Sequence, residues 1–179
     1  MSIRPATLDD AGSLAAIYGP YVADTAISFE VVPPTDAEMR ERIRTTLVDY
    51  PWLVWEEAGQ ARGYAYATQH RTRKAYQWAV DVSVYIDSAY HGRGAGRRLY
   101  GALFEVLVRQ GFVQAYAGIT LPNEKSVGLH EALGFAPVGI YRRVGFKHGQ
   151  WRDVGWWCLE LQRHPADPAP PVPWSALEG

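Results

Sequence analysis

The segment from Trp78 to Ile86, which from Val80 onward alternates between aliphatic and polar or aromatic side chains, constrains the fold more than any other feature. Successive side chains of a strand point to opposite faces of its sheet. One face would carry four aliphatic residues, Val80, Val82, Val84 and Ile86. The other face would carry Asp81, Ser83 and Tyr85. The pattern therefore predicts a long strand with one apolar face and one face bearing a carboxylate.

A glycine-rich turn, residues 91–97, follows that strand and opens a predicted helix over about 94–110. Small residues let the backbone approach a ligand closely, and the first amides of a helix have no acceptor inside it. Arg93, Arg97 and Arg98 add positive charge to the turn. These features indicate a site for a diphosphate, and the alternative is a glycine-rich connection that binds nothing.

Two other phosphate-binding motifs fit this turn poorly. A P-loop ends in Gly-Lys-Ser/Thr, whereas Gly96 is followed by Arg97 and Arg98. A dinucleotide fingerprint has two residues between its second and third glycines, and a single residue separates Gly94 from Gly96.

The other elements alternate between helix and strand. Helical spacing and capping patterns predict helices over about 10–22, 35–48 and 124–133. Strands are expected at 2–6, 52–55, 63–68, 113–120, 138–144 and 154–161. We expect an α+β fold with one dominant sheet, forming a single domain over 1–163. Five prolines crowd residues 164–179, which we interpret as an extended or mobile tail.

Composition excludes several classes of protein. The chain has eighteen basic residues and nineteen acidic ones, so no overall charge favours binding to nucleic acid or to an anionic membrane. No apolar stretch is long enough for a membrane helix or a signal peptide. The single cysteine, Cys158, cannot form a disulfide within the chain, and we expect a buried thiol and no metal site. A cytoplasmic protein is the expectation.

Several blocks resemble one family. The stretch 83–86 with His91 to Gly96 is similar to the coenzyme A motif of the GNAT acetyltransferase superfamily, which reads Gln/Arg-x-x-Gly-x-Gly/Ala. A second block follows, with Asn123, Ser126, His130, Gly134 and Phe135 at the family's spacing. Residues 50–54, 121–123, 130–135 and 145–155 resemble the phosphinothricin N-acetyltransferase branch. The match covers roughly residues 3–162.

The resemblance implies a GNAT fold, with a mixed sheet of about seven strands flanked by helices, and acetyl-coenzyme A as cosubstrate without a metal. It also implies a homodimer. The backbones of Val84, Tyr85 and Ile86 would pair with the pantetheine arm. The diphosphate would lie on the turn, formed by His91, Gly92, Arg93, Gly94, Ala95, Gly96 and Arg97. Asn123 and Ser126 would supply polar contacts, although both also suit a helix cap.

The resemblance implies catalytic roles at three residues. Asp81 stands where relatives of this branch usually carry Glu, and we expect it to act as general base, with Glu30 as the alternative. A backbone N–H near Tyr85 would stabilise the oxyanion. His130 occupies the position where many family members place a Tyr that protonates the leaving thiolate. His91 departs from the motif's Gln or Arg.

The acceptor is expected to be the α-amine of a small glutamate-like amino acid, such as phosphinothricin, methionine sulfoximine or methionine sulfone. Guanidinium groups suit carboxylate, phosphinate or sulfone oxygens, and the loop before the long strand carries Arg71, Thr72 and Arg73. Phe29, Val82 and Ser83 would complete the pocket. Lys147, His148 and Trp151 would line it or lie at a subunit contact. The alternatives are an enzyme acting on a protein N-terminus, a lysine or a polyamine, and a non-catalytic coenzyme A sensor.

Overall fold

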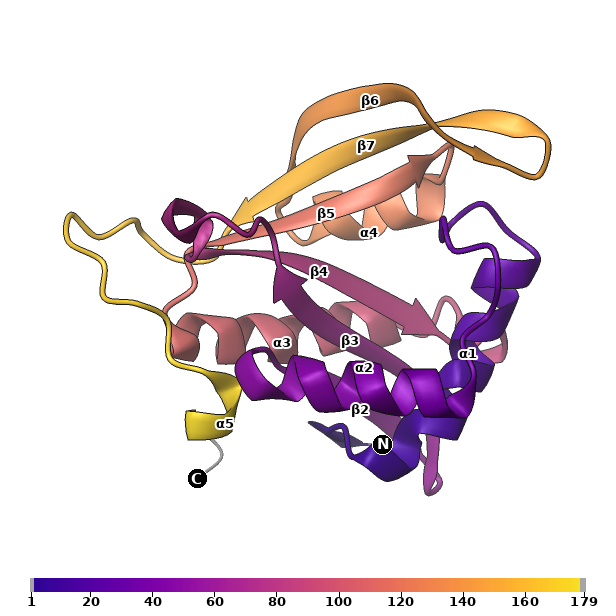
Figure 1. Cartoon of the computed structure of the whole chain (residues 1–179), viewed down its shortest axis with the longest axis horizontal. Coiled ribbons are helices and arrows are strands. Elements are labelled where there is room, and N and C mark those ends of the chain that lie inside the picture. Colours follow the sequence, from indigo (N-terminus) through magenta and orange to yellow (C-terminus); the bar gives the residue numbers. More distant parts are fainter. Residues whose placement is uncertain (1, 178–179) are drawn as a thin grey trace.

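Seven strands form one mixed sheet in the computed structural model, which describes residues 2–177 (Figure 1). Their order across the sheet is β1-β2-β3-β4-β5-β7-β6. The strands are β1 (Ser2–Pro5), β2 (Trp52–Glu57), β3 (Gln60–Gln69), β4 (Ala79–Ile86), β5 (Gln114–Leu121), β6 (Ala136–Lys147) and β7 (Gln150–Glu160). Neighbouring strands are antiparallel except β4 and β5, which are parallel. The expected mixed sheet of about seven strands is confirmed.

Helices cover both faces of the sheet. They are α1 (Ala11–Ala23), α2 (Asp36–Asp49), α3 (Ala95–Gln110), α4 (Glu124–Ala132) and α5 (Trp174–Leu177). On one face, α1 and α2 bury Leu14, Met39 and Ile43 against the sheet. On the other, α3 buries Leu99 and Leu103, and α4 packs beside β5. Every helix among the described residues is too short or too polar to cross a membrane.

The two parallel strands separate soon after they meet. Only Ala79, Val80 and Asp81 of β4 pair with β5, and beyond Asp81 the strands fan apart (Figure 1). Residues 82–86 therefore pair with β3 on one side and with no strand of the described part of the chain on the other. Unpaired backbone groups at a strand edge are available to another extended chain.

The predicted helix ends are largely confirmed. Thr35 and Glu38 form the capping box of α2, with Thr35 N–H 2.7 Å from Glu38 Oε2 and Glu38 N–H 3.2 Å from Thr35 Oγ1. Gly94, with φ +77°, precedes α3 and Gly111, with φ +94°, ends it. Glycine adopts this left-handed conformation without steric cost.

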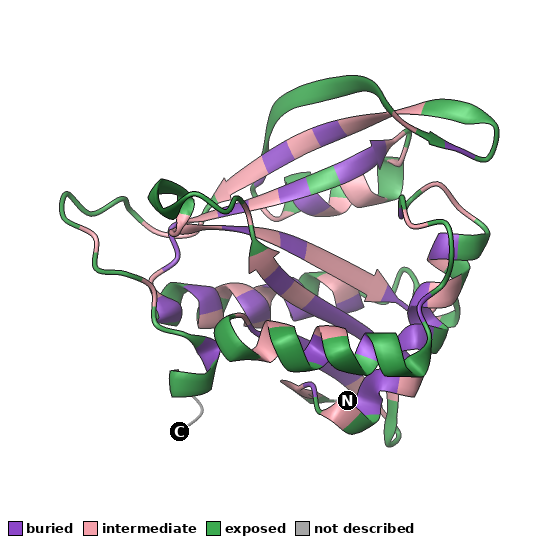
Figure 2. Cartoon of the chain, in the orientation of Figure 1, coloured by how far each residue is buried: buried purple, intermediate pink, exposed green. Residues whose placement is uncertain are grey.

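The last two strands are longer than predicted. The expected strands at 138–144 and 154–161 extend to residues 136–147 and 150–160, and a tight turn at His148 and Gly149 joins them. Both turn residues have positive φ, 51° and 72°, as the favoured two-residue hairpin turn requires. The side chains of β6 are mostly exposed (Figure 2), including the apolar residues Val138, Ile140, Val144 and Phe146 that alternate along it.

The proline-rich tail contacts the domain. Val172 exchanges backbone hydrogen bonds with the main chain and side chain of Gln110. Trp174 in α5 is buried, and Ser175 Oγ donates to the carbonyl of Val48 at 2.9 Å. The tail thus packs against the ends of α2 and α3. The division of the chain at residue 163 stays a prediction.

Candidate active site

A narrow cleft opens where β4 and β5 separate. Most of its lining comes from Val82–Tyr85 of β4 and Ala117–Thr120 of β5. Helix α4 and its N-cap residue contribute three predicted site residues, Asn123, Ser126 and His130. The structure thus brings Val82, Ser83, Val84 and Tyr85 together with the α4 set. Ile27 and Tyr100, which were not predicted, also border the cleft.

The open edge of β4 ends at the carbonyl of Ile86, which already accepts a hydrogen bond from within the protein. Tyr21 donates its hydroxyl proton to Ile86 O at 2.5 Å, and His91 Nε2 lies 3.1 Å from the same oxygen and 2.8 Å from the Tyr21 hydroxyl. The His91 side chain therefore fastens α1 to the end of β4. The main-chain groups of Val84 remain on the open edge, whereas the carbonyl of Ile86 does not. Asp87 N–H bonds the Arg62 carbonyl at 2.8 Å, so alternation along the antiparallel pair directs the main-chain groups of Tyr85 toward Tyr64 of β3.

The glycine turn beyond it fits a diphosphate. Gly92 and Gly94 have φ of +76° and +77°, and no atom lies within 4 Å of the position that a Cβ would occupy at either. Arg98 N–H reaches the carbonyl of Gly94 at 3.2 Å, so the amides before it in α3 have no acceptor within the helix. Ala95 is buried under the turn. Open space and unpaired amides are what an anion at a helix N-terminus needs.

Two arginines of this turn, Arg93 and Arg97, contact other parts of the protein. The Arg93 guanidinium lies over the Tyr90 ring at 4.6 Å. Arg97 donates to the carbonyl of Ala132 at 3.4 Å, which links α3 to the end of α4. Both side chains are exposed and remain available to phosphate oxygens.

Asp81 lies at the point where the two strands part. It is the last β4 residue paired with β5, opposite Tyr116. Its Oδ1 is 2.6 Å from Nδ1 of His70. Burial raises the pKa of the Asp81 carboxyl, and the bond to His70 partly offsets that effect. A carboxylate beside an imidazole at the head of the cleft is a typical acid–base arrangement.

His130 is buried in the wall of the cleft. Its Nδ1 donates to the carbonyl of Ser126 at 2.7 Å, and its Nε2 lies 3.1 Å from the Tyr100 hydroxyl. A carbonyl only accepts, so Nδ1 carries the proton and the neutral ring accepts from Tyr100. Burial lowers the pKa of His130 and favours this neutral form. Both ring nitrogens of His130 thus have hydrogen-bond partners, and the Tyr100 hydroxyl adjoins the residue that was predicted to protonate the thiolate.

Two polar residues near His130 form the N-terminal cap of α4. Asn123 Oδ1 accepts from Ser126 N–H at 3.2 Å at the start of the helix. The capping interpretation of Asn123 is therefore present in the structure. Both residues also line the cleft, so capping and ligand contact are compatible.

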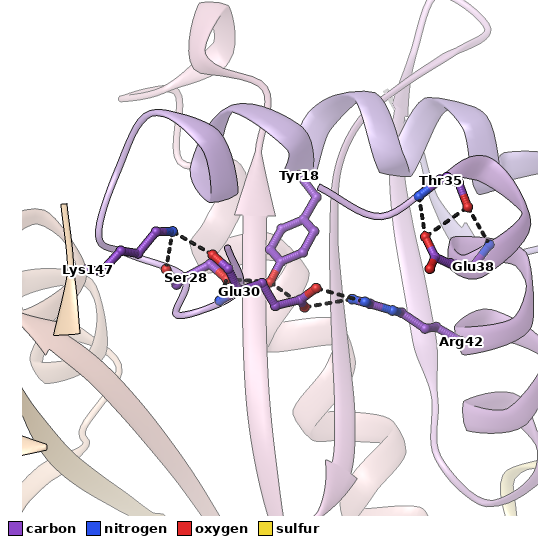
Figure 3. Close-up of polar contacts among 7 residues, drawn as sticks. All are labelled: Tyr18, Ser28, Glu30, Thr35, Glu38, Arg42 and Lys147. Carbon is purple, nitrogen blue, oxygen red and sulfur yellow. Dashed lines mark hydrogen bonds and ion pairs between the residues drawn. The ribbon is translucent and has the colours of Figure 1, made fainter. Parts of the chain in front are cut away.

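A loop at residues 24–34 closes the cleft on the side of α1. Lys147 Nζ, on the buried end of β6, donates to the carbonyls of Val22, Ser28 and Glu30 at 2.6, 2.7 and 2.7 Å. Figure 3 shows Lys147 and Arg42 reaching the loop from opposite sides. These bonds place Lys147 inside the structure, beneath the loop.

Glu30 belongs to this anchor. Arg42 binds both of its carboxylate oxygens at 2.7 and 2.8 Å, and Tyr18 donates to it at 2.9 Å (Figure 3). The Arg42 contact is the main cause of a lowered pKa for Glu30. A carboxylate held in a bidentate ion pair is a weak base. The arrangement favours Asp81 over Glu30 as the basic group.

The remaining acceptor candidates lie around this loop and the end of β3. Phe29 packs its ring on Gly145 of β6. Arg71 is exposed, with its guanidinium 5.8 Å from the Trp156 ring. Thr72 and Arg73 are exposed beside it, and Arg73 precedes the short 3₁₀ helix Lys74–Tyr76. Arg71 thus lies near the cleft, whereas the structure gives Thr72 no contact that draws it there.

Comparison with known proteins shows to which family the chain belongs. Residues 3–156 match the model described as "Acetyltransferase (GNAT) domain". The chain belongs to the GNAT acetyltransferase family. The expected GNAT fold and N-acetyltransferase class are therefore confirmed.

The relatives of this GNAT enzyme include phosphinothricin acetyltransferases and methionine sulfoximine/methionine sulfone acetyltransferases. A phosphinothricin N-acetyltransferase of Streptomyces viridochromogenes is 40% identical over 173 residues, covering 97% of this chain and 92% of the relative. An L-methionine sulfoximine/L-methionine sulfone acetyltransferase of Salmonella typhimurium is 34% identical, covering 94% and 99%. The structure of a phosphinothricin acetyltransferase from Sinorhizobium meliloti in complex with acetyl-CoA superposes with a TM-score of 0.88, at 33% identity and 97% coverage of both chains.

The sequence analysis did not single out His70 or Tyr100, and it did not predict the buried contacts of Lys147. His70 follows the last residue of β3 and lies two residues beyond Thr68, which pairs with Asp81, so continued alternation would have placed it on the face of Asp81. Tyr100 sits one helical step from the apolar stripe of α3. The partners of Lys147 are backbone carbonyls more than a hundred residues away, which no local pattern reveals.

Proposed function

We propose that the enzyme transfers the acetyl group of acetyl-CoA to the α-amine of a glutamate-like amino acid, such as phosphinothricin, methionine sulfoximine or methionine sulfone. The observation that carries this proposal is the open edge of β4. It is bounded at one end by the glycine turn at 92–97 and at the other by Asp81. A donor that extends along this edge from the turn would bring its thioester beside the carboxylate.

The acetyl-CoA side follows from the backbone. Main-chain groups of Val84 would bind the pantetheine arm as an added strand, and a backbone N–H near Tyr85 would stabilise the oxyanion. Contacts of this kind are worth about 3–4 kcal/mol in other enzymes. The Tyr100 hydroxyl would pass a proton to the leaving sulfur, and His130 would act through it once Nε2 has taken up a proton.

The acceptor side follows from charge. Asp81 provides a base next to the cleft, and Arg71 is close enough to lower the pKa of that carboxyl. An amino acid with an anionic or strongly polar side chain would place its oxygens on Arg71 and its ammonium group toward Asp81. The names of the relatives in Streptomyces and Salmonella support this class of acceptor.

A homodimer in the cytoplasm is part of the proposal. The hairpin of β6 and β7 exposes several large apolar side chains, namely Val138, Ile140, Tyr141, Val144, Phe146 and Trp151. An apolar surface of this extent is typical of a subunit interface, and a second copy of the chain would cover it.

The test is release of free thiol from acetyl-CoA with a panel of acceptors. We expect methionine sulfone and phosphinothricin to give the highest kcat/KM, well above peptides with free N-termini, lysine and polyamines. Preference for a peptide or polyamine would overturn the acceptor class. Binding of acetyl-CoA without thiol release on any amine would favour a sensor. Asp81→Asn should lower kcat by about 100-fold or more while the KM for acetyl-CoA stays nearly constant, and Asp167→Asn in the tail is its control.

A further inference from the structure

His70 and Asp81 form a close pair at the head of the cleft. The distance from His70 Nδ1 to Asp81 Oδ1 is 2.6 Å. An ionised carboxylate only accepts hydrogen bonds, so Nδ1 of the neutral ring carries the proton and Nε2 keeps its lone pair. Within residues 2–177 the only side-chain hydrogen bond of His70 is the one to Asp81. The pair therefore holds a basic nitrogen without a partner among the described residues.

Aromatic contacts fix the plane of the His70 ring. It stacks on Tyr116 at 4.3 Å with an interplanar angle of 13°. The rings of Tyr76 and Trp156 meet it edge-on at 6.1 and 6.2 Å. Its side chain is 11% exposed. A ring held on one face and two edges has few rotamers, so Nε2 has a defined position.

That position lies at the point where the strands part. Tyr116 is the β5 residue paired with Asp81, in the last pair before β4 and β5 separate. Alternation along β3 places Thr68 and His70 on the face of Asp81 and Ser83, and Ser83 lines the cleft. This is the face on which α1 packs, since Tyr85 contacts Tyr18. His70 therefore belongs to the acceptor side of the cleft, opposite α3.

Resting on the acetyl transfer proposed above, we propose that Nε2 of His70 is the atom that takes the proton from the acceptor's ammonium group, while Asp81 acts as its positioning residue. The ammonium gives one proton to Nε2, and the freed amine nitrogen forms a bond to the acetyl carbon. The carbon–sulfur bond breaks and the sulfur leaves as a thiolate. The nitrogen loses its second proton as the amide forms, and that proton neutralises the thiolate. The charge that arises on the imidazolium is balanced by Asp81.

Chemistry favours the imidazole over the carboxylate as acceptor of that proton. A base is most effective when its pKa lies near the working pH, and histidine meets this condition more closely than aspartate. Asp81 is one methylene shorter than glutamate, and His70 spans the added distance to the acceptor. The titratable groups that face the imidazole are Asp81, Tyr76 and Tyr116, and Arg71 is its neighbour in the chain.

The experiment compares His70→Ala and His70→Gln with the parent enzyme. Removal of a general base lowers the rate by about 100- to 10,000-fold, so we expect a loss of that size in kcat/KM for methionine sulfone. Added imidazole should restore activity to His70→Ala and not to His70→Gln, whose side chain fills the space. The limb of the pH profile on the acid side should disappear in both. His164→Gln, in the exposed tail, should behave as the parent.

Calorimetry with acetyl-CoA separates the possible failures. Unchanged affinity in both variants shows that the fold and the cofactor cleft are intact. If the parent enzyme itself releases no thiol with any amine, the proposed function fails. If the parent is active and the His70 variants keep its rate and pH profile, or lose only acceptor affinity without imidazole rescue, the proton-accepting role of His70 is wrong.

Discussion

At the scale of single residues, the glycine turn is defined by backbone conformation. Gly92 and Gly94 adopt positive φ in open space, so a side chain there would be strained although nothing would clash with it. Such strain costs about 1–2 kcal/mol for a residue with a Cβ. Relief of the strain would rotate the amides that we propose to hold the diphosphate.

We therefore expect Gly94→Ala to weaken acetyl-CoA binding by about tenfold, because 1.4 kcal/mol corresponds to a factor of ten. The measurement is the Kd by calorimetry. Gly59→Ala is the matched control, since Gly59 has φ +74° with no atom within 4 Å of its Cβ position and lies in the β2–β3 turn. An equal loss of affinity in the two variants would contradict a role for the turn's amides.

At the scale of elements, the loop at 24–34 depends on contacts from distant parts of the chain. Lys147, only 6% exposed, donates to two carbonyls of the loop, those of Ser28 and Glu30, and to the carbonyl of Val22 at the end of α1. Hydrogen bonds from charged donors contribute about 1.5–3 kcal/mol each, and a buried acceptor left without a donor is costly. The Lys147 side chain thus ties the loop to β6 by hydrogen bonds.

Replacing Lys147 by Met should lower the Tm by several degrees and raise the KM for the acceptor about tenfold, since 1.4 kcal/mol is a factor of ten. The KM for acetyl-CoA should change little, because the glycine turn lies on other elements. Steady-state kinetics with each substrate varied in turn separates the two effects. Arg109→Met on the surface of α3 is the control, and a parallel rise in both KM values would contradict a loop-specific role.

The same loop should respond to acid through Glu30. Its pKa is lowered in the folded protein, chiefly by Arg42, so its contribution to stability is present above the pKa of the unfolded chain, near 4.5. That contribution is lost as the pH falls through the lower folded pKa. Glu30→Gln should therefore reduce the Tm at pH 7 and converge with the parent in acid. A constant difference in Tm between pH 7 and pH 3 would contradict this account.

At the scale of the whole molecule, the β6–β7 hairpin presents the main exposed apolar surface. Phe146 and Trp151 contact each other at 5.4 Å while remaining 60% and 56% exposed. A second copy would bury them, and a charge at either position would be costly in such an interface. Their location predicts a dimer built on this hairpin.

Phe146→Glu together with Trp151→Glu should convert a dimer of about 40 kDa, twice the 20.0 kDa of one chain, into a monomer. Sedimentation velocity measures the change directly. Val108→Glu, an exposed apolar position on α3, should leave the dimer intact. A monomeric parent protein would refute the interface.

The sequence predicted the parts of the molecule that depend on local patterns. Alternation in β4, the capping box at Thr35 and the glycines around α3 act over a few residues, and the structure contains all three. Contacts between distant residues were not predictable from such patterns. The ring of His70 on Tyr116 requires the register of three strands, and the ends of β6 depend on its pairing with β7.

The most direct test of the account is a crystal structure of the enzyme with coenzyme A and methionine sulfone bound together. We expect the diphosphate on the amides of residues 92–97, the pantetheine along the open edge of β4, and the amine of the sulfone within hydrogen-bond distance of His70 Nε2 or Asp81. A diphosphate bound away from that turn, or an amine on the far side of the sheet from Asp81, would contradict it.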